Sequence, residues 1–362
     1  YDHIISVSKN VCIRYGFHSF STPIFEFSEV FKKTLGNSSD IVTKEMYTFK
    51  DKGNEEITLR PEGTAGIIRA IISNGLTHEM PFKVFYNGPM FRYERPQKGR
   101  LRQFHQIGIE IIGVQNEIAD TEVIACGHRL LKELKIDNKV SLEINSLGKI
   151  EDRKKYIKDL LNYLKSYKNK LSADSLKRFE KNPLRILDSK NEEDINIISN
   201  APKILEYLND ESKSNFQNIL NNLKSLNISY NINPKLVRGL DYYNNIAFEF
   251  ISQELGAQGA VIAGGRYDGL MMQMGGPDLP GIGWAAGLER ISLLTKTNKN
   301  NIKSITIIPL GYKSQKFCIK IAEQLRKEKI KTNITYSGNL KKRLQSANKL
   351  LSDFALIIGE KE

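Results

Sequence analysis

The sequence predicts an α+β fold, in which a core of strands and helices is interrupted by a helical insertion and followed by a smaller α/β domain. Three observations support this prediction. Residues 1–148 and 229–297 mix strand-like and helix-like patterns, residues 149–228 show only helical periodicity, and residues 298–362 alternate strands with helices. We therefore expect four segments, of which the first and the third together form the core domain.

Local signals predict the elements of the first segment. Residues 30–35 have a helical pattern that ends at Gly36, and residues 57–59 form a short strand stopped by Pro61. Two further helices are expected at residues 64–72 and 120–134.

A polar hairpin is the most informative part of this segment. Residues 91–96 and 103–110 are predicted to form two antiparallel strands, joined by the basic loop of residues 97–102. Because side chains alternate across a strand, the polar positions fall on one face and the isoleucines of the second strand on the other. The polar positions are Arg92, Glu94, Gln106, Gly108 and Glu110. A solvated strand face is also polar, but other segments favour the floor of a polar pocket with a cationic lid for phosphate.

The second segment is rich in lysine and asparagine. Its clearest feature is one apolar stripe at helical spacing, formed by Tyr156, Ile157, Leu160, Leu161 and Leu164. It carries no convergent catalytic side chains and is expected to be a helical insertion.

The third segment returns to strands. Residues 247–251 and 260–263 are strand-like, residues 263–269 are expected to form a tight glycine turn under a small substrate, and the glycine-rich residues 281–290 are expected to open a helix that continues to residue 295. Residues 296–301 have the polar composition of a linker.

The last segment predicts a parallel sheet with crossover helices. The expected strands are residues 304–308, 332–336 and 354–358, and the expected helices are residues 314–327 and 340–350. We expect a complete domain of this kind to continue beyond residue 362, and we expect the natural N-terminus to precede Tyr1.

Composition restricts the class of protein. The hydrophobic fraction of 40% and the mean hydropathy of −0.38 are typical of a globular chain, and no apolar run is as long as a membrane span. The formal charge of +13 fits either a nucleic-acid partner or diffuse surface lysine. Cys12, Cys126 and Cys318 lie far apart, which argues against a zinc site or disulfide framework and favours a reducing cytoplasm.

Three short motifs carry the candidate chemistry. Glu62 and Thr64 stand at a strand-to-helix turn, where Glu62 can accept a ligand ammonium group or Thr64 can simply cap the helix. Arg238 precedes a glycine and a pair of tyrosines, a setting suited to phosphate or carboxylate oxygens. Arg290 follows small residues that are expected to share one helical face with it and to clear room for a nucleotide.

These motifs resemble those of a known family. The sequences FRYE (91–94) and GLER (287–290) are similar to the second and third signature motifs of class II aminoacyl-tRNA synthetases. The blocks ERPQKGR, LVRGLDYY and AGGRYDGL resemble histidyl-tRNA synthetases of bacterial type, over nearly the whole chain. The resemblance implies an antiparallel catalytic core with six central strands, a C-terminal anticodon-binding domain, a homodimer with Pro23 near its interface, and a shortened N-terminal segment.

The resemblance also implies a reaction and its site. ATP, with Mg²⁺ and no metal bound by protein alone, would activate L-histidine to histidyl-adenylate, and the histidine would then pass to the 3′ end of tRNA(His). The implied ATP-binding residues are Arg92, Glu94, Arg100, Phe104 and Arg290. The implied histidine-binding residues are Glu62, Gly63, Thr64, Arg92, Gln106, Glu110, Arg238, Tyr242, Tyr243 and Tyr267, and the implied catalytic residues are Arg238 and Arg92.

Two alternatives remain open at this stage. The regulatory subunit of ATP phosphoribosyltransferase resembles the same catalytic fold, but it lacks the C-terminal domain and tends to have eroded motifs. A class II synthetase for threonine or proline is the other alternative, and the block around Arg238 and the missing metal ligands argue against it.

Overall fold

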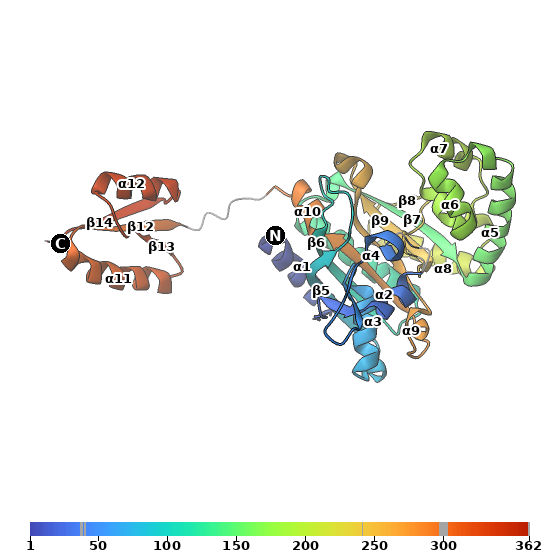
Figure 1. The fold of residues 1–362 in the computed structure, drawn as a ribbon, viewed down its shortest axis with the longest axis horizontal. Coiled ribbons are helices and arrows are strands. Elements are labelled where there is room, and N and C mark those ends of the chain that lie inside the picture. Colours follow the sequence, from blue (N-terminus) through green and yellow to red (C-terminus); the bar gives the residue numbers. More distant parts are fainter. Residues whose placement is uncertain (37–38, 40, 241, 297–302, 361–362) are drawn as a thin grey trace. The chain divides into compact units, whose positions relative to one another are not determined.

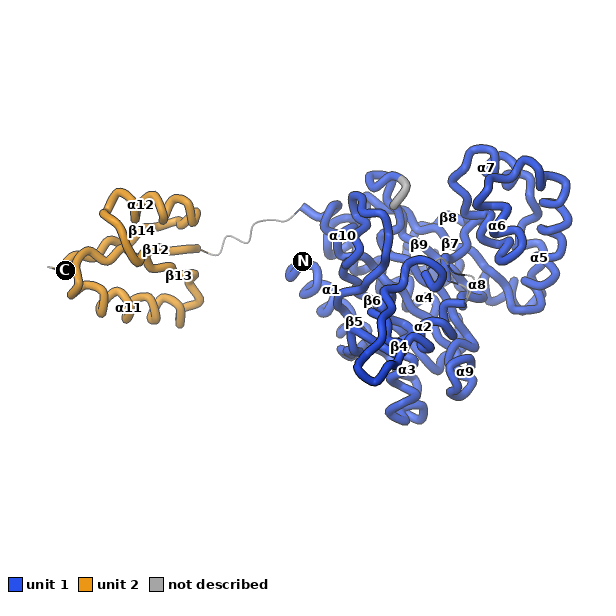
Figure 2. The backbone as a smooth tube through the Cα atoms, viewed as in Figure 1, with its two compact units in different colours: residues 1–296 blue, residues 297–362 orange. Residues whose placement is uncertain are grey.

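The computed structural model describes all residues except 37–38, 40, 241, 297–302 and 361–362. The chain forms two compact units, Tyr1–Lys296 and Thr297–Glu362 (Figure 2). Apart from Lys296, the predicted linker lies outside the described residues.

The centre of the first unit is an eight-stranded sheet of order β1-β5-β6-β11-β10-β9-β7-β8 (Figure 1). Its strands are β1 (His18–Ser19), β5 (Phe82–Phe91), β6 (Gln103–Ile112), β7 (Ser141–Gly148), β8 (Asn231–Ile232), β9 (Asn244–Ile251), β10 (Ala260–Arg266) and β11 (Gly281–Gly287). The six inner strands pair antiparallel, and only the short edge strands β1 and β8 pair parallel. The expected antiparallel core is confirmed.

Helices cover one face of this sheet. They are α1 (Asp2–Arg14), α4 (Glu117–Glu133), α8 (Asp210–Ser225) and α10 (Leu288–Leu294). Their apolar sides bury Ile107, Ile109 and Ile111 of β6, each at most 1% exposed. The alternation predicted for β6 is confirmed, and it turns Gln106, Gly108 and Glu110 to the other face. Although α8 lies within residues 149–228, its apolar side packs in this core.

The opposite face carries a second core. It is built on α2 (Ser28–Leu35), α3 (Thr64–Ser73) and α9 (Leu270–Gln273), beside a small antiparallel sheet of order β2-β4-β3. The strands of that sheet are β2 (Phe25–Phe27), β3 (Tyr47–Lys50) and β4 (Glu56–Leu59).

The inserted helices have a core of their own. They are α5 (Ile150–Lys165), α6 (Ala173–Lys181) and α7 (Glu192–Ser199), which gather beside the edge of the sheet that holds β7 and β8 (Figure 1). Tyr156, Leu160 and Leu164 of the predicted stripe are at most 1% exposed, and Ile157 and Leu161 are half-buried. Short helical turns complete the unit: η1 (Ile41–Glu45), η2 (Leu76–His78), η3 (Asp137–Lys139), η4 (Lys168–Lys170), η5 (Pro183–Asp188), η6 (Ile204–Glu206) and η7 (Gln253–Gln258).

Two glycine-rich predictions are wrong. Residues 281–287 form strand β11 instead of opening a helix, so Gly283 and Gly287 share no helical face with Arg290. Gly264 and Gly265 lie in strand β10 instead of a turn. The reason is close packing, because a Cβ added at Gly264 would lie 2.2 Å from the carbonyl oxygen of Gly283 on the neighbouring strand.

The first strand of the predicted hairpin is also misplaced. Strand β5 ends at Phe91, opposite Gln103, and residues 92–96 lie outside it. Past Phe91 the backbone N–H of Arg92 still donates to the carbonyl oxygen of Arg102 at 2.8 Å, whereas that of Tyr93 donates to the carbonyl oxygen of Glu45 at 2.7 Å and so turns away from β6.

The second unit has the predicted parallel sheet, of order β13-β12-β14. Its elements are β12 (Ser304–Pro309), α11 (Tyr312–Lys327), β13 (Lys331–Ile334), α12 (Leu340–Lys349) and β14 (Phe354–Ile358). Ile307, Cys318, Ala322 and Ile358 form its core.

Candidate active site

One cavity of about 210 Å³ brings together residues from both halves of the core domain. Of the residues implied by the resemblance, it is lined by Glu62, Thr64, Arg92, Glu94, Arg100, Phe104, Gln106, Glu110, Arg238, Tyr242, Tyr243 and Arg290. Gly63 and Tyr267 are not in its lining. Gly63 lies against the ring of Tyr86, and the hydroxyl of Tyr267 donates to Glu110, which lines the cavity. The arginines at 92, 238 and 290, which are far apart in the sequence, therefore share one cavity.

Glycines make room for this cavity in the middle of the sheet. Gly283 of β11 lies opposite Glu110 of β6, and a Cβ at Gly283 would lie 1.8 Å from Oε2 of Glu110. Gly63 and Gly108 both lie against the ring of Tyr86, where an added Cβ would approach ring atoms within 2.4 Å. These positions exclude any side chain for steric reasons.

Glu62 has a structural role in addition to its place in the cavity. Its carboxylate accepts hydrogen bonds from the backbone N–H groups of Thr64 at 2.6 Å and Ala65 at 2.8 Å, the first residues of α3. The alternative that Thr64 caps this helix is wrong, because Glu62 does so and Gly63 occupies the N-cap position. Burial raises the pKa of Glu62, and the two backbone donors oppose that shift.

Glu110 is a buried carboxyl group with two hydroxyl donors. Its Oε1 accepts from Oγ1 of Thr64 and its Oε2 from the hydroxyl of Tyr267, both at 2.7 Å. The side chain is 1% exposed, and burial raises the pKa of Glu110 to about 8 despite these hydrogen bonds. This raised pKa favours the protonated form of the carboxyl group near neutral pH.

Arginines crowd the opposite end of the cavity. Nε of Arg92 donates to the carbonyl oxygen of Pro61 at 2.9 Å, and its Cζ lies 5.3 Å from the ring centre of Phe104. Arg290 donates to the carbonyl oxygens of Gly99 and Ala260, at 3.2 and 2.7 Å. Burial lowers the pKa of Arg290, and the positive charges of Arg100 and Arg92 lower it further. This arrangement attracts anions.

Arg238 reaches the cavity from a third direction. It forms an ion pair with Glu249 of β9, in which each side chain is 16% exposed, and its Cζ lies 5.2 Å from the ring centre of Tyr243. Its Nε is buried and has no hydrogen-bond partner among the described residues, and the same holds for Oε1 of Gln106. A donor and an acceptor thus stand unsatisfied in one cavity, and such groups favour a polar ligand.

Sequence reasoning missed three residues of this site. Glu249 holds Arg238, the buried Tyr86 underlies two glycines, and Glu289 lines the cavity and accepts from the backbone N–H of His105 at 3.0 Å. The isolated charge of Glu249 between Phe248 and Phe250 was the available signal. Tyr86 gave no signal, because it reads as an ordinary strand residue.

A second cavity of about 570 Å³ adjoins the first and shares Arg92, Arg100, Arg238 and Arg290 with it. Arg185 and Lys190 of the insertion also line it, together with the acidic side chains of Glu45, Glu143 and Asp188, so the approach to the site carries charges of both signs. Within the described ranges, no cluster of three or more His, Cys, Asp or Glu side chains could hold a metal ion.

Comparison with known proteins assigns both units. Residues 6–291 match the family model described as histidyl-tRNA synthetase, and residues 304–362 match the model of an anticodon-binding domain. The chain is 49% identical to the histidine–tRNA ligase of Rhodospirillum rubrum, over 99% of this chain and 87% of the relative. It is 50% identical to that of Wolbachia pipientis wMel, over 100% of this chain and 88% of the relative.

Solved structures agree with this. The apo histidyl-tRNA synthetase of Staphylococcus aureus is 32% identical, with a TM-score of 0.81 over 99% of this chain and 87% of that one. A Bacillus halodurans protein described as an ATP phosphoribosyltransferase regulatory subunit/histidyl-tRNA synthetase is 18% identical, with a TM-score of 0.71 over 99% of this chain and 93% of that one, and shows the shared fold alone.

Proposed function

The chain belongs to the histidyl-tRNA synthetase family, and from this premise we propose how the residues of its cavity perform the family's reaction. Members of this family are ligases that use ATP to join histidine to tRNA. The expectation of an enzyme is confirmed over that of a regulatory subunit. The second unit, matched to an anticodon-binding domain, is the part in which lysine and arginine greatly outnumber acidic residues. This charge supports contact with tRNA.

We propose that histidine binds between Glu110 and Arg238. The unsatisfied Oε1 of Gln106, with Glu62, would accept the α-ammonium group, and the unsatisfied Nε of Arg238, with Arg92, would donate to the carboxylate. Glu110 would bind the imidazole, and Tyr242 and Tyr243 would enclose it. The pair of unsatisfied atoms is the observation that carries this proposal, because a zwitterionic amino acid supplies one partner for each.

ATP would occupy the arginine-rich end. Arg92, Arg100 and Arg290 would contact phosphates or adenine, Glu94 would hold Arg100, and Phe104 would stack on the base. The Cζ of Arg92 lies 5.3 Å from the centre of the Phe104 ring. Glu289, which lines this cavity, would hold Mg²⁺ as a companion of the nucleotide, since Mg²⁺ usually takes one or two carboxylates together with phosphate oxygens. When bound, it would neutralise phosphate charge.

Histidine activation needs no general base in this arrangement. The α-carboxylate of an amino acid has a pKa of about 3.5, so it is ionised at neutral pH and can attack the α-phosphorus of ATP directly. The carboxyl oxygen forms a bond to the α-phosphorus while the bond from that phosphorus to the α,β-bridging oxygen breaks, and this oxygen leaves with pyrophosphate. The task of the protein is to align two anions and to stabilise the charge on the phosphate, which Arg92 and Arg238 would do. The 3′ end of tRNA would then take the histidine from the adenylate.

Isotope exchange tests this proposal. We expect exchange of labelled pyrophosphate into ATP with histidine and with none of the other amino acids, and we expect EDTA to abolish it, as nucleotide chemistry with Mg²⁺ requires. Exchange with another amino acid would contradict the histidine site, and full exchange in EDTA would contradict the role of Mg²⁺.

We also propose that the protein forms a homodimer through its small sheet. The apolar side chains of β2 and β3 point away from the core, with Phe25, Phe27 and Phe49 between 49 and 59% exposed. The opposite face of the same sheet carries polar side chains, of which Thr58 is buried and shares hydrogen bonds with Ser28 of α2 and with Thr48. An exposed aromatic sheet face favours a permanent partner, and Pro23 lies two residues before β2.

Changing Phe27 to Asp is expected to convert the dimer to monomer, because a charge is then buried in an apolar interface. Light scattering with size-exclusion chromatography measures this. The matched control is Ile195→Asp on α7, an exposed residue of the insertion at 42%, which should leave the mass unchanged. A wild-type monomer at micromolar concentration would contradict the proposal.

A cytoplasmic location is proposed from the cysteines. Cys12, Cys126 and Cys318 are all buried and all free, as in proteins of a reducing compartment. No helix in the described part of the chain has the length and apolar character to cross a membrane.

A further inference from the structure

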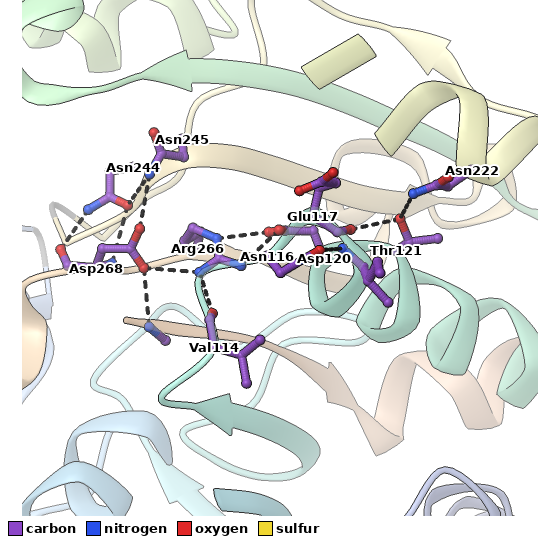
Figure 3. A network of polar contacts seen from close by, with 12 residues as sticks. Val114, Asn116, Glu117, Asp120, Thr121, Asn222, Asn244, Asn245, Arg266 and Asp268 are labelled. Carbon is purple, nitrogen blue, oxygen red and sulfur yellow. Dashed lines mark hydrogen bonds and ion pairs between the residues drawn. The ribbon is translucent and has the colours of Figure 1, made fainter. Parts of the chain in front are cut away.

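A charged pair lies behind the cavity, outside its lining. Arg266 at the end of β10 is 3% exposed and binds Asp120 of α4 through two parallel hydrogen bonds, Nε to Oδ1 at 2.9 Å and Nη2 to Oδ2 at 2.8 Å (Figure 3). Its Nη1 donates to the carbonyl oxygen of Val114 at 2.9 Å and to Asp268 at 3.2 Å. The implied reaction gives these groups no role.

We propose that the Arg266–Asp120 pair is a positioning device for histidine recognition, which fixes Tyr267 and through it the carboxyl group of Glu110. The proposal rests on the role assigned to Glu110 above. Arg266 is a positioning residue, since it is not in the lining of the histidine cavity and instead lines, with Asp120, a separate cavity of about 360 Å³.

Tyr267 connects the pair to the cavity. Its hydroxyl donates to Glu110 at 2.7 Å, its backbone N–H donates to the carbonyl oxygen of Gly281 at 2.8 Å, and its side chain is 2% exposed. Adjacent side chains along an extended chain point to opposite sides. Arg266 thus points to α4 while Tyr267 packs in the second core with α9.

Asp268, which follows Tyr267 in the chain, is also fixed by hydrogen bonds. Asp268 accepts from Nη1 of Arg266, from the backbone N–H of Gly281 at 3.2 Å and from Nδ2 of Asn245 at 3.0 Å. Asn244 bonds both the N–H and the carbonyl oxygen of Asp268, at 3.2 and 2.7 Å (Figure 3). Tyr267 is held between two fixed neighbours, so little freedom remains for its ring.

The pairing of strand β10 is irregular at this point. The pairing of β10 with β9 shifts register between Gly265 and Arg266. A register shift leaves the following residues without the regular ladder to orient them. On its other side β10 stays paired with β11 through Arg266 and Ile282, and the bidentate pair with α4 adds a contact where the β9 pairing is irregular. Helix α4 packs in the first core, and its Thr121 accepts a hydrogen bond from Asn222 of α8 at 3.3 Å.

A charged pair at this depth is better explained by geometry than by stability. Burial raises the pKa of Asp120 while Arg266 lowers it, so desolvation opposes the pair. Apolar residues of similar size often give equal stability, whereas a bidentate guanidinium–carboxylate contact fixes orientation.

A double-mutant cycle tests the proposal. We expect Arg266→Lys, which cannot form the bidentate contact, to raise the KM for histidine roughly tenfold in pyrophosphate exchange, with the KM for ATP unchanged within about twofold. Tyr267→Phe alone should give a similar increase. In the Tyr267→Phe background, Arg266→Lys should add less than about twofold, because its effect passes through the missing hydroxyl.

The controls separate the possible failures. Glu122→Gln breaks a half-exposed ion pair of α4 with Lys83 and should leave both KM values unchanged. Equal increases for histidine and ATP, or independent effects of Arg266→Lys and Tyr267→Phe, would overturn the positioning role. If Arg266→Lys does not fold, the same cycle with Asp120→Asn decides. An unchanged KM for histidine in Tyr267→Phe would instead remove the role assigned to Glu110, and with it the proposed histidine site.

Discussion

Replacing Arg238 with alanine is expected to lower the rate of histidine adenylation at least about a hundredfold, as the loss of one fixed donor to a charged transition state does elsewhere. Arg238 is largely buried, and its Nε is without a hydrogen-bond partner among the described residues. Its ion pair with Glu249 holds it ready before the substrates arrive, so no side chain has to be ordered during the reaction. Pyrophosphate exchange at saturating histidine and ATP measures the effect.

The control is an arginine of the same unit without a role in the cavity. Arg14 of α1 forms an exposed ion pair with Glu133, and Arg14→Ala should leave exchange unchanged. Glu249→Gln should slow exchange less than Arg238→Ala, because it loosens the guanidinium without removing it. Wild-type exchange in Arg238→Ala would exclude this residue from the mechanism.

Changing Glu110 to Gln is expected to raise the KM for histidine roughly ten- to a hundredfold while that for ATP changes little. The buried carboxyl group is the only acid within reach of both Thr64 and Tyr267 among the described contacts, and it can exchange a proton with an imidazole. Glutamine keeps the size but cannot ionise. A parallel increase in both constants would show that Glu110 supports the whole cavity rather than the imidazole site.

The same variant has a pH signature. The pKa of Glu110 is about 8 in the folded protein, against about 4.3 for an unperturbed glutamate. Between these values the unfolded chain releases the proton before the folded chain does, so the contribution of Glu110 to stability is complete at low pH and is lost as the pH rises towards 8. The Tm of wild type should therefore fall relative to that of Glu110→Gln between pH 5 and 8. A constant difference would contradict the raised pKa.

The sequence predicts this site better than it predicts the strands that carry it. Alternation placed Gln106, Gly108 and Glu110 on one face, and burial of the isoleucines on the other confirms it. The glycine-rich segments failed because a strand of small residues has neither the apolar alternation nor the β-branched side chains by which strands are recognised. Gly264 and Gly283 are in strands because neighbouring chains leave no room for a Cβ, which only the tertiary structure reveals.

The cap of α3 and the ion-pair partners of Arg238 and Arg266 could not be predicted from neighbouring residues either. Thr64 has the usual chemistry of an N-cap residue, yet the carboxylate of Glu62 takes that place and leaves the Thr64 hydroxyl to Glu110. The partner of Arg266 comes from α4, 146 residues away, and that of Arg238 from β9, 11 residues away but on another element. The predicted residues meet in one cavity because the sheet brings distant strands together, and their individual roles stay predictions.

The strand order has a consequence for biosynthesis. Strand β6 carries Glu110 and pairs on one side with β5, which precedes it, but on the other side with β11, which begins only at Gly281. At elongation rates of about 5–20 residues per second, the ribosome needs roughly ten seconds or more to deliver that neighbour. For this interval β6 presents an unpaired strand edge, which is a template for pairing with another unfinished copy of the chain.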